Sequence, residues 1–216
     1  MDKKQFIIIG LGVFGSTVAR ELSKVGHDVL GIDLDGEKVS QIADEITCAV
    51  TADASLESTL NELNAGNYDV AVIATGSNLE TSVLATMQLR EMGVEEVWAK
   101  ARTYPHHKIL QRVGATRIIA PEYETGIRVS RELIYPMVQN YIDLKDDLFV
   151  VELLPSEDLC TRSLKDVIGK LAITPLILKR GSNANTHPSL DECLQSGDCL
   201  VVSGKIDDLR KLAASV

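Results

Sequence analysis

Three glycines near the beginning of the chain have a spacing that can hold a phosphate group. They belong to a G-x-G-x-x-G pattern, Gly10-Leu11-Gly12-Val13-Phe14-Gly15. The pattern follows a short apolar run at 6–9 and opens an amphipathic segment at 16–25, which is the strand–turn–helix context that the motif requires. In that context the first glycine makes the tight turn, the second leaves room for a pyrophosphate, and the third lets the helix pack closely on the strand.

The start of the expected helix gives a second reason for an anion to bind at this turn. Unpaired backbone amides and the helix dipole both attract negative charge to a helix N-terminus. We therefore expect the nucleotide phosphates to contact the turn, namely Gly10, Gly12, Val13, Phe14 and Gly15. The alternative is a strand–turn–helix whose glycines serve only to allow close packing.

An acidic residue stands where it would bind a ribose. Asp33 ends the second apolar run, 28–33, and follows Gly15 by 18 residues. A carboxylate at this place accepts hydrogen bonds from the ribose hydroxyls. No arginine follows it, and Asp35 and Glu37 would repel a 2′-phosphate. The sequence therefore favours NAD(H) or another adenine nucleotide such as ATP or ADP over NADP.

Small and polar residues also follow three later strand-like runs. They are Asp53 and Ala54 after the third run, Ala74, Thr75 and Gly76 at the end of the fourth, and Lys100 at the end of the fifth. Parallel sheets bind ligands at the carboxyl ends of their strands, so we expect these residues to contact the nucleotide. Asp53 either accepts a hydrogen bond from the adenine amino group or caps the helix that begins near Ser55. Lys100 either meets a phosphate or ribose or is solvated.

Two other groups of titratable residues have competing interpretations. Glu122 and Glu124 follow Pro121, where acids favour a helix N-terminus, and the alternative is that each faces a nucleotide-bound cation. His106 and His107 are adjacent, so they point in different directions on a helix, and no third metal ligand is visible near them. We interpret these histidines as a solvated helix start.

The elements that position these residues alternate along the first 120 residues. Apolar runs lie at 6–9, 28–33, a short one opening at 50, 70–74, 97–99 and 117–120, and helical patterns lie between them at 16–25, 36–46, 55–65, 78–92 and 105–113. This alternation predicts right-handed crossovers and a parallel sheet, and the almost wholly apolar runs are typical of strands buried on both faces. The expected fold class is α/β, a Rossmann-like doubly wound parallel sheet of about six strands.

The pattern changes in the last third of the chain. Apolar residues on two faces predict one long helix over 123–141, and a polar joint at 143–147 follows it. Beyond the joint we expect strands at 149–154, 176–179 and 199–203, helices near 163–170 and 206–213, and a loop at 182–189. The domains are then a nucleotide-binding domain over 1–122, a crossover helix and linker over 123–142, and a small C-terminal α+β domain over 143–216.

Composition argues against several classes of function. The 31 acidic and 22 basic residues give a net charge of −9, and aromatics are only 4%, so we expect no nucleic-acid partner. The four cysteines form no C-x-x-C pair and fit a reducing cytosol. The chain has no signal-peptide pattern and no apolar run near 18 residues, so we expect a cytoplasmic protein that reaches a membrane only through a partner.

No catalytic constellation accompanies the glycine turn. A dehydrogenase needs a proton-transfer residue beside the nicotinamide, and the chain has no Tyr-x-x-x-Lys pair and no plausible His/Asp pair. We therefore expect a protein that reads the nucleotide as a signal and is not an enzyme. The alternatives are a small NAD-dependent oxidoreductase or redox-sensing protein, and a nucleotide-sensing transcription regulator, for which a basic reading helix is missing.

Segments along nearly the whole chain resemble a single family. They are residues 5–15, 26–33, 97–101, 106–110, 113–115, 117–122, 140–144 and 197–204. On these segments the sequence resembles the RCK domains, and more closely the cytosolic regulatory subunits of Ktr/Trk-type potassium uptake systems. The resemblance implies dimers linked by a crossover helix, assembled as a ring beneath a membrane-embedded potassium pore. Exchange of ATP for ADP, or of NADH for NAD, would change the dimer angle and gate the pore.

The resemblance also implies roles for single residues. Asp33 would be the ribose ligand, Asp53 an adenine-side contact and Lys100 a strand-end contact, while Glu122 matches an acid that helps to hold a divalent cation between paired subunits. One departure is Val13, because Ktr members usually carry there an arginine that reaches the terminal phosphates. The departure favours NAD or a shorter adenine nucleotide over discrimination between ATP and ADP.

A second ligand is implied by the resemblance alone. Some C-terminal domains of the family bind cyclic di-AMP with an arginine in the segment before the middle strand. Here that segment reads Val167-Ile168-Gly169-Lys170, without an arginine.

Overall fold

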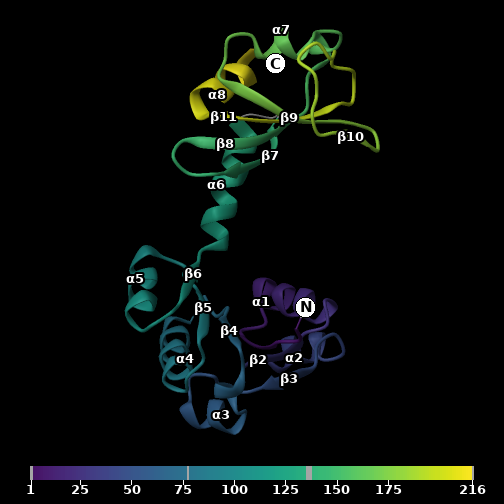
Figure 1. Cartoon of the computed structure of the whole chain (residues 1–216). Helices are drawn as coiled ribbons and strands as arrows, with labels where there is room; N and C mark the ends of the chain where they lie inside the picture. The colour runs from purple at the N-terminus through teal and green to yellow at the C-terminus, as the bar shows by residue number, and fades with distance from the viewer. Residues whose placement is uncertain (1, 77, 135–137, 216) are drawn as a thin grey trace. The chain divides into compact units, whose positions relative to one another are not determined.

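The computed structural model describes residues 2–76, 78–134 and 138–215. The chain separates into two compact units, Met1–Tyr123 and Glu124–Val216. Each unit is built on one β-sheet (Figure 1). Helix α6, Pro121–Ile134, contains the point where the chain passes from the first unit into the second.

The first unit contains a six-stranded parallel sheet in the order β3-β2-β1-β4-β5-β6. Its strands are β1 Gln5–Ile9, β2 Asp28–Asp33, β3 Cys48–Thr51, β4 Val70–Ile73, β5 Glu96–Lys100 and β6 Arg117–Ile119. The strand order reverses between β1 and β4, and doubly wound sheets bind ligands at the carboxyl ends of the strands at such a reversal. The predicted Rossmann-like sheet of about six strands is confirmed.

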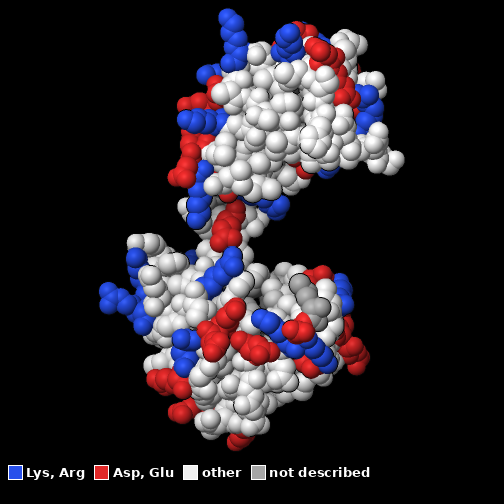
Figure 2. Space-filling view, viewed as in Figure 1, with Lys and Arg blue, Asp and Glu red and all other residues white. Residues whose placement is uncertain are grey.

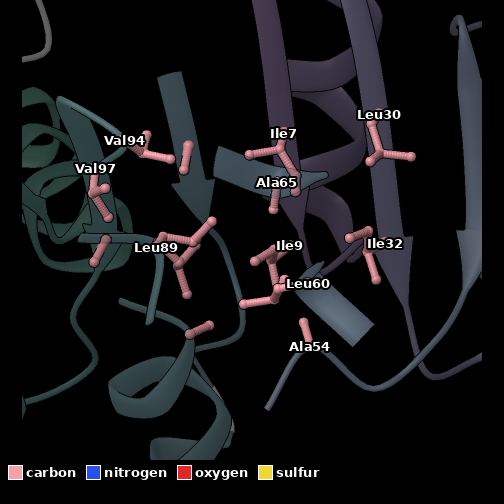
Figure 3. Packing of buried hydrophobic residues seen from close by; sticks show 14 of the residues in the cluster. Ile7, Ile9, Leu30, Ile32, Ala54, Leu60, Ala65, Leu89, Val94 and Val97 are labelled. Carbon is pink, nitrogen blue, oxygen red and sulfur yellow. The ribbon is translucent and has the colours of Figure 1, made fainter. Parts of the chain in front are cut away.

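Both faces of this sheet are buried. Successive side chains of a strand point to opposite faces, so Ile7 and Ile9 belong to one buried cluster and Ile8 to another. Figure 3 shows the first cluster, in which side chains of β1 and β2 lie near Leu60 and Leu89 from the helices. A strand covered on both sides has to be apolar along its whole length, which explains the uninterrupted apolar run at its start.

The segments between the strands are mostly helical. They are α1 Val13–Lys24, α2 Gly36–Ile42, α3 Glu57–Glu62, the 3-10 turn η1 Ala65–Asn67, α4 Leu79–Glu91 and α5 Tyr104–Arg112. Side chains of α1 and α2 join the cluster that contains Ile8, whereas those of α3, α4 and α5 join the cluster that contains Ile7. Asp35, Asn78 and Thr103 cap α2, α4 and α5 by accepting hydrogen bonds from backbone amides of the first turn.

The second unit contains a five-stranded antiparallel sheet in the order β10-β9-β11-β8-β7. Its elements are β7 Val138–Asp143, β8 Leu148–Leu153, η2 Glu157–Leu159, α7 Leu164–Ile168, β9 Ile173–Arg180, β10 Asn183–Asn185, β11 Cys199–Lys205 and α8 Ile206–Ser215. Buried and half-buried residues alternate along β11, with Leu200 and Val202 facing a core to which α8 contributes Leu209 and Leu212. One face of this sheet is therefore packed, as is common in antiparallel sheets.

The predicted long helix over 123–141 is wrong in its last part. Helix α6 ends at Ile134, and Val138–Asp143 forms strand β7, which pairs with β8. Residues 135–137 of the predicted helix lie outside the described residues. Val138 and Tyr141 pack against the core of the second unit, so tertiary contacts decide the conformation there. The sequence holds a signal against one continuous helix, because the proline at position 136 disfavours helical backbone in the residue before it.

The predicted loop over 182–189 is also partly wrong. Asn183–Asn185 forms strand β10 and pairs with the end of β9. Its three residues, two asparagines and one alanine, are all exposed, so neither periodicity nor hydrophobicity marks them as a strand. Strand β9, at Ile173–Arg180, is longer than the predicted 176–179 for a related reason, because Thr174, Pro175 and Arg180 among the added residues do not continue the apolar run.

Candidate functional site

The three glycines of the turn fill sterically different roles. Gly10 has φ +94°, in the left-handed region, and a Cβ there would lie 2.7 Å from Thr75 Cγ2. A Cβ on Gly15 would lie 1.9 Å from the carbonyl oxygen of Gly10, so α1 could not pack where it does. A Cβ on Gly12 would have no neighbour within 4 Å. The space beside Gly12 is where a phosphate would approach the backbone.

The N-terminus of α1 is open beside that space. Val13, the first residue of the helix, is 89% exposed, and Gly12 caps the helix without a side-chain hydrogen bond. The orphan amides of a first turn are usually satisfied by a side chain, water or a ligand. No acidic side chain stands in the first turn of α1, so an incoming phosphate meets no fixed negative charge from this helix.

Asp33 is held in place by the glycine turn itself. Its Oδ2 accepts a hydrogen bond of 2.7 Å from the backbone amide of Leu11, and its Oδ1 accepts one of 2.9 Å from the amide of Asp35. The side chain is 13% exposed. A carboxylate has about four acceptor sites, so a ribose can still donate to Asp33 while both amide bonds remain.

A cleft opens at the carboxyl ends of β1, β2 and β4. The predicted residues that line it are Gly10, Gly12, Asp33, Ala54, Ala74 and Thr75. Further lining residues that were not predicted from the sequence are Ile9, Ile32, Leu34, Lys38, Ala52, Asn78 and Thr81. Lys38 lies 3.3 Å from Asp35 and 3.8 Å from Asp33, measured from Nζ to the carboxylate oxygens. Its place in the first helical turn after the acid is the signal that could have identified it.

The wall of the cleft contains an unsatisfied polar atom. Thr75 Oγ1 is buried and has no hydrogen-bond partner among the described residues. Buried polar atoms normally have a partner, so this hydroxyl is an exception in the cleft wall. Asp53 behaves differently, because its Oδ1 accepts from both the amide and the hydroxyl of Ser55, which lowers the pKa of the Asp53 carboxyl. These bonds lie in the turn before α3, whose N-cap is Leu56 without a side-chain hydrogen bond, so the predicted alternative that Asp53 caps this helix is wrong.

Lys100 and Glu122, predicted for separate roles, form one ion pair. Lys100 Nζ donates to Glu122 Oε1, and this bond lowers the pKa of the Glu122 carboxyl. The Lys100 stem lies against Gly76, where a Cβ would be 3.3 Å from its Cε, and its ammonium is 5.8 Å from the centroid of the Phe14 ring. Lys100 is thus not solvated, which corrects that alternative. Neither residue is among the described residues that line the cleft.

The histidines do not form a solvated helix start. His106 is 5% exposed, its Nε2 lies 3.2 Å from the Ser82 hydroxyl, and its Nδ1 accepts from the amide of Arg102 at 3.4 Å. Burial lowers the pKa of His106. His107 Nδ1 is buried too and lacks a partner among the described residues. The interpretation failed because α5 packs this side of its first turn against α4, which the local sequence does not reveal.

Over the described residues, no cluster of three or more histidine, cysteine, aspartate or glutamate side chains is arranged to hold a metal ion. None of the described helices combines the length and the apolar character needed to cross a bilayer. On the face shown in Figure 2, Lys and Arg side chains are interspersed with Asp and Glu. That face shows no extended basic stripe of the kind that nucleic acid requires.

Comparisons with known proteins give consistent matches. The TrkA-N domain family matches residues 6–121. The Ktr system potassium uptake protein A of Bacillus subtilis is 38% identical over 98% of this chain and 96% of its own length. The Ktr system potassium uptake protein C of the same organism is 32% identical over 99% of this chain and 98% of its own length. A solved structure of the GsuK channel bound to NAD has the same fold, with a TM-score of 0.59 at 15% identity, over all of this chain and 39% of that one.

Proposed function

The chain belongs to the family of Ktr system potassium uptake proteins A and C, and on that premise we propose that it is a regulatory subunit that binds an adenine nucleotide. The observation that carries the proposal is the bond between Leu11 and Asp33, which fixes the ribose-binding acid against the glycine turn. Its proposed partner is a membrane-embedded potassium transport protein, at the cytoplasmic side of the membrane. In this proposal the chain reads the nucleotide and is not itself an enzyme.

Different residues of the cleft would contact different parts of the nucleotide. The space beside Gly12 and the first turn of α1 takes the phosphates, and Asp33 takes the ribose hydroxyls. Thr75 lines the cleft, with its hydroxyl buried in the wall. The ligand is NAD(H) or ATP/ADP. The NAD bound to the GsuK channel supports a dinucleotide, and the exposed valine at position 13 supports it too, because that side chain offers no charge to a terminal phosphate.

Regulation requires that the nucleotide distinguish two arrangements of the subunits. A ligand shifts an equilibrium only by the difference between its affinities for the two states. We propose that copies of this chain form dimers and a ring, and that occupancy of the cleft biases one dimer shape over another. The shape then sets the activity of the potassium transport partner.

Glu122 alone does not supply enough ligands for a divalent cation. In its ion pair with Lys100 it is the single acid, whereas Ca²⁺ or Mg²⁺ needs about six oxygen ligands. The neighbouring Lys100 ammonium also opposes a cation at the same carboxylate. Phosphate oxygens or a second copy of Glu122 would have to supply the remaining ligands, so no step of the proposed function is assigned to a cation.

The main competing function is a small NAD-dependent oxidoreductase. The described residues that line the cleft include no histidine, tyrosine or cysteine to transfer a proton. Incubation with NADH and a panel of carbonyl compounds separates the two functions. Turnover above background would favour the oxidoreductase.

Calorimetric titration of the full-length chain with ATP, ADP, NAD and NADH tests the proposal. We expect saturable binding of at least one of them, weakened by about tenfold in Asp33→Ala, because charged acceptors contribute about 1.5–3 kcal/mol. The matched control is Asp44→Ala, because Asp44 is an exposed acid of the same unit that lies outside the cleft. Absence of binding by all four nucleotides would reject the proposal.

A further inference from the structure

The turn that leads from β5 into α5 is fastened by one buried histidine, His106, which lies in the first turn of α5. We propose that His106 is a pH-sensitive latch, which holds this turn closed while its ring is neutral and releases it when the ring takes up a proton. The latch consists of His106 with its partners Ser82, Arg102 and Thr103. The described residues that line the nucleotide cleft include none of these four, so the inference does not rest on the proposed function.

The side chain of His106 joins the turn to a neighbouring helix. Its Nδ1 accepts a hydrogen bond of 3.4 Å from the backbone amide of Arg102, which lies in the turn. Its Nε2 lies 3.2 Å from the hydroxyl of Ser82, a fully buried residue of α4. The backbone amide of His106 donates to Thr103 Oγ1, the cap of α5, at 3.3 Å. One ring thus ties the turn and the start of α5 to α4.

These contacts decide where the proton of the ring is. A backbone amide can only donate, so Nδ1 is the acceptor and carries no hydrogen. The neutral ring then has its single proton on Nε2, from which it donates to the Ser82 hydroxyl. A second proton would go to Nδ1, where it would meet the amide hydrogen of Arg102. Two donors cannot share a hydrogen bond, so protonation breaks the contact that closes the turn.

The surroundings offer a protonated ring no counter-charge. The titratable groups near it on the adjoining elements are Glu80 on α4, Arg102 in the turn, and Tyr104, His107 and Lys108 on α5. All of these except His107 are exposed side chains. Burial lowers the pKa of His106, and none of the described charged side chains contributes to that shift. A buried cation without a partner is costly, so the turn has to open and let water reach the ring.

Release of the latch acts on a second cleft of the first unit. The residues that line this cleft include Arg102, Thr103, Tyr104 and His107, from the turn and the first turn of α5. Ala120 and Tyr123, at the start of α6, line it as well. The latch fixes the first group of residues, so protonation of His106 changes the cleft beside the start of α6. The latch therefore makes this part of the first unit sensitive to pH.

The size of the response follows from proton linkage. Opening of the turn is coupled to uptake of one proton, so the equilibrium constant for opening should rise about tenfold for each unit by which the pH falls. Because the pKa of His106 is lowered in the closed turn, the rise begins near the ordinary value of 6.5 and stops at the lowered pKa. Above that range the latch is closed and its stability does not depend on pH.

The experiment is hydrogen–deuterium exchange of the full chain without nucleotide, between about pH 7 and about pH 5, where carboxylates outside the site stay ionised. The reporters are the amides of Arg102, His106 and His107, which donate within the turn. Their exchange is corrected for the rate of an unstructured peptide at each pH. The internal control is the amide of Val113, which donates to Ile109 at the other end of α5 and should keep its protection.

The matched variants are His106→Asn and His107→Asn. Asparagine keeps an acceptor near the place of Nδ1 but does not titrate, so His106→Asn should remove the pH dependence of the three reporter amides. His107→Asn makes the same substitution at the next residue, which is not bonded to the amide of Arg102, and should retain that dependence. The ring ¹⁵N chemical shifts of His106 in the wild-type chain give a second measurement that needs no variant.

The outcomes decide the inference. An unprotonated Nδ1 at neutral pH, together with a pH response that His106→Asn abolishes, supports the latch. A response of the same slope in the wild type and in His106→Asn, or no response in the wild type, would overturn it. A proton on Nδ1 at neutral pH would overturn it as well, and this result stands even if His106→Asn does not fold.

Discussion

The two sheets of this protein bury their residues in different ways. In the first unit, β1 contributes Ile7 and Ile9 to one core and Ile8 to the other, so the strand is apolar throughout. In the second unit, β11 buries Leu200 and Val202 on one face only. At the ends of the strands of the first sheet, backbone groups and a few small residues line a cleft. In the second sheet, polar side chains on different strands form hydrogen bonds with one another. The first sheet thus leaves a cleft at the ends of its strands, whereas the second sheet pairs its polar side chains across its strands.

The largest expected effect is on the packing of the glycine turn in the first unit. Gly15→Ala places a Cβ 1.9 Å from a backbone oxygen that cannot move aside, so we expect the free energy of unfolding of this unit to fall by about 4 kcal/mol. Urea denaturation followed by the fluorescence of Trp98, the single tryptophan of the chain, reports on this unit alone.

The matched control is Gly12→Ala. Open space surrounds that position, so its stability should change by less than about 1 kcal/mol while nucleotide binding weakens. Equal loss of stability in the two variants would show that both glycines serve packing, which would remove the contrast between the two units.

A smaller effect is expected at an ion pair of the second unit in which only the acid is buried. The Asp198 side chain is fully buried and accepts hydrogen bonds of 2.9 Å from Nε and Nη2 of Arg180 and one of 2.8 Å from the amide of Gln195. Asp198→Asn should lower the free energy of unfolding of this unit by about 2 kcal/mol, less than for a fully buried pair because Arg180 is partly exposed.

Hydrogen–deuterium exchange of β8 and β11 measures this loss, and the Trp98 transition serves as the internal control because it lies in the other unit. If Asp198→Asn also shifted the Trp98 transition, the two units would not unfold separately, and the comparison between them would fail.

The smallest effect is the acid stability contributed by Glu152. This carboxylate accepts from Cys199 Sγ at 2.9 Å, Asn140 Nδ2 at 2.8 Å and Lys179 Nζ at 3.2 Å, which lowers its pKa to about 2. A lowered pKa means that the stabilisation is complete above the usual value of 4.5 and is lost as the pH falls toward 2. Because Glu152 and its partner Lys179 are partly solvated, we expect the free energy of unfolding of this unit to fall by about 1 kcal/mol on acidification.

Glu152→Gln should remove this pH dependence from the second unit. The measurement is the pH dependence of exchange protection in β8 between about pH 5 and about pH 2.5, which covers most of the interval between the usual pKa of 4.5 and the lowered pKa of about 2, where the stabilisation is lost. The variant and the wild type are compared at the same denaturant concentration. If exchange protection falls by the same amount in the variant and in the wild type on acidification, other carboxylates are responsible for the pH dependence.

The glycine turn and Asp33 were predictable from the sequence because each role depends on one residue type. Only glycine fits at a position where a Cβ would meet the Gly10 oxygen, and a carboxylate at the end of β2 accepts a hydrogen bond from the amide of Leu11 in the turn. The doubly wound sheet was predictable for a similar reason, since its strands are apolar on both faces.

The pairing of Lys100 with Glu122 was not predictable, because it depends on how the end of β5 meets the start of α6 across β6. Strand β7 was missed because its alternation is weak and local helical spacing outweighed it, while pairing with β8 decided its conformation. Burial of His106 depends likewise on the contact between α4 and α5.

The most direct test of the central claim locates the bound nucleotide. Hydrogen–deuterium exchange is measured on the full chain with and without NAD or ADP at a concentration that calorimetry shows to be saturating. We predict slower exchange at residues 10–15, 33–38 and 74–76, which carry the glycine turn, the ribose acid and the end of β4. Unchanged exchange in those three segments while the nucleotide is bound elsewhere would contradict the claim that this turn is the nucleotide site.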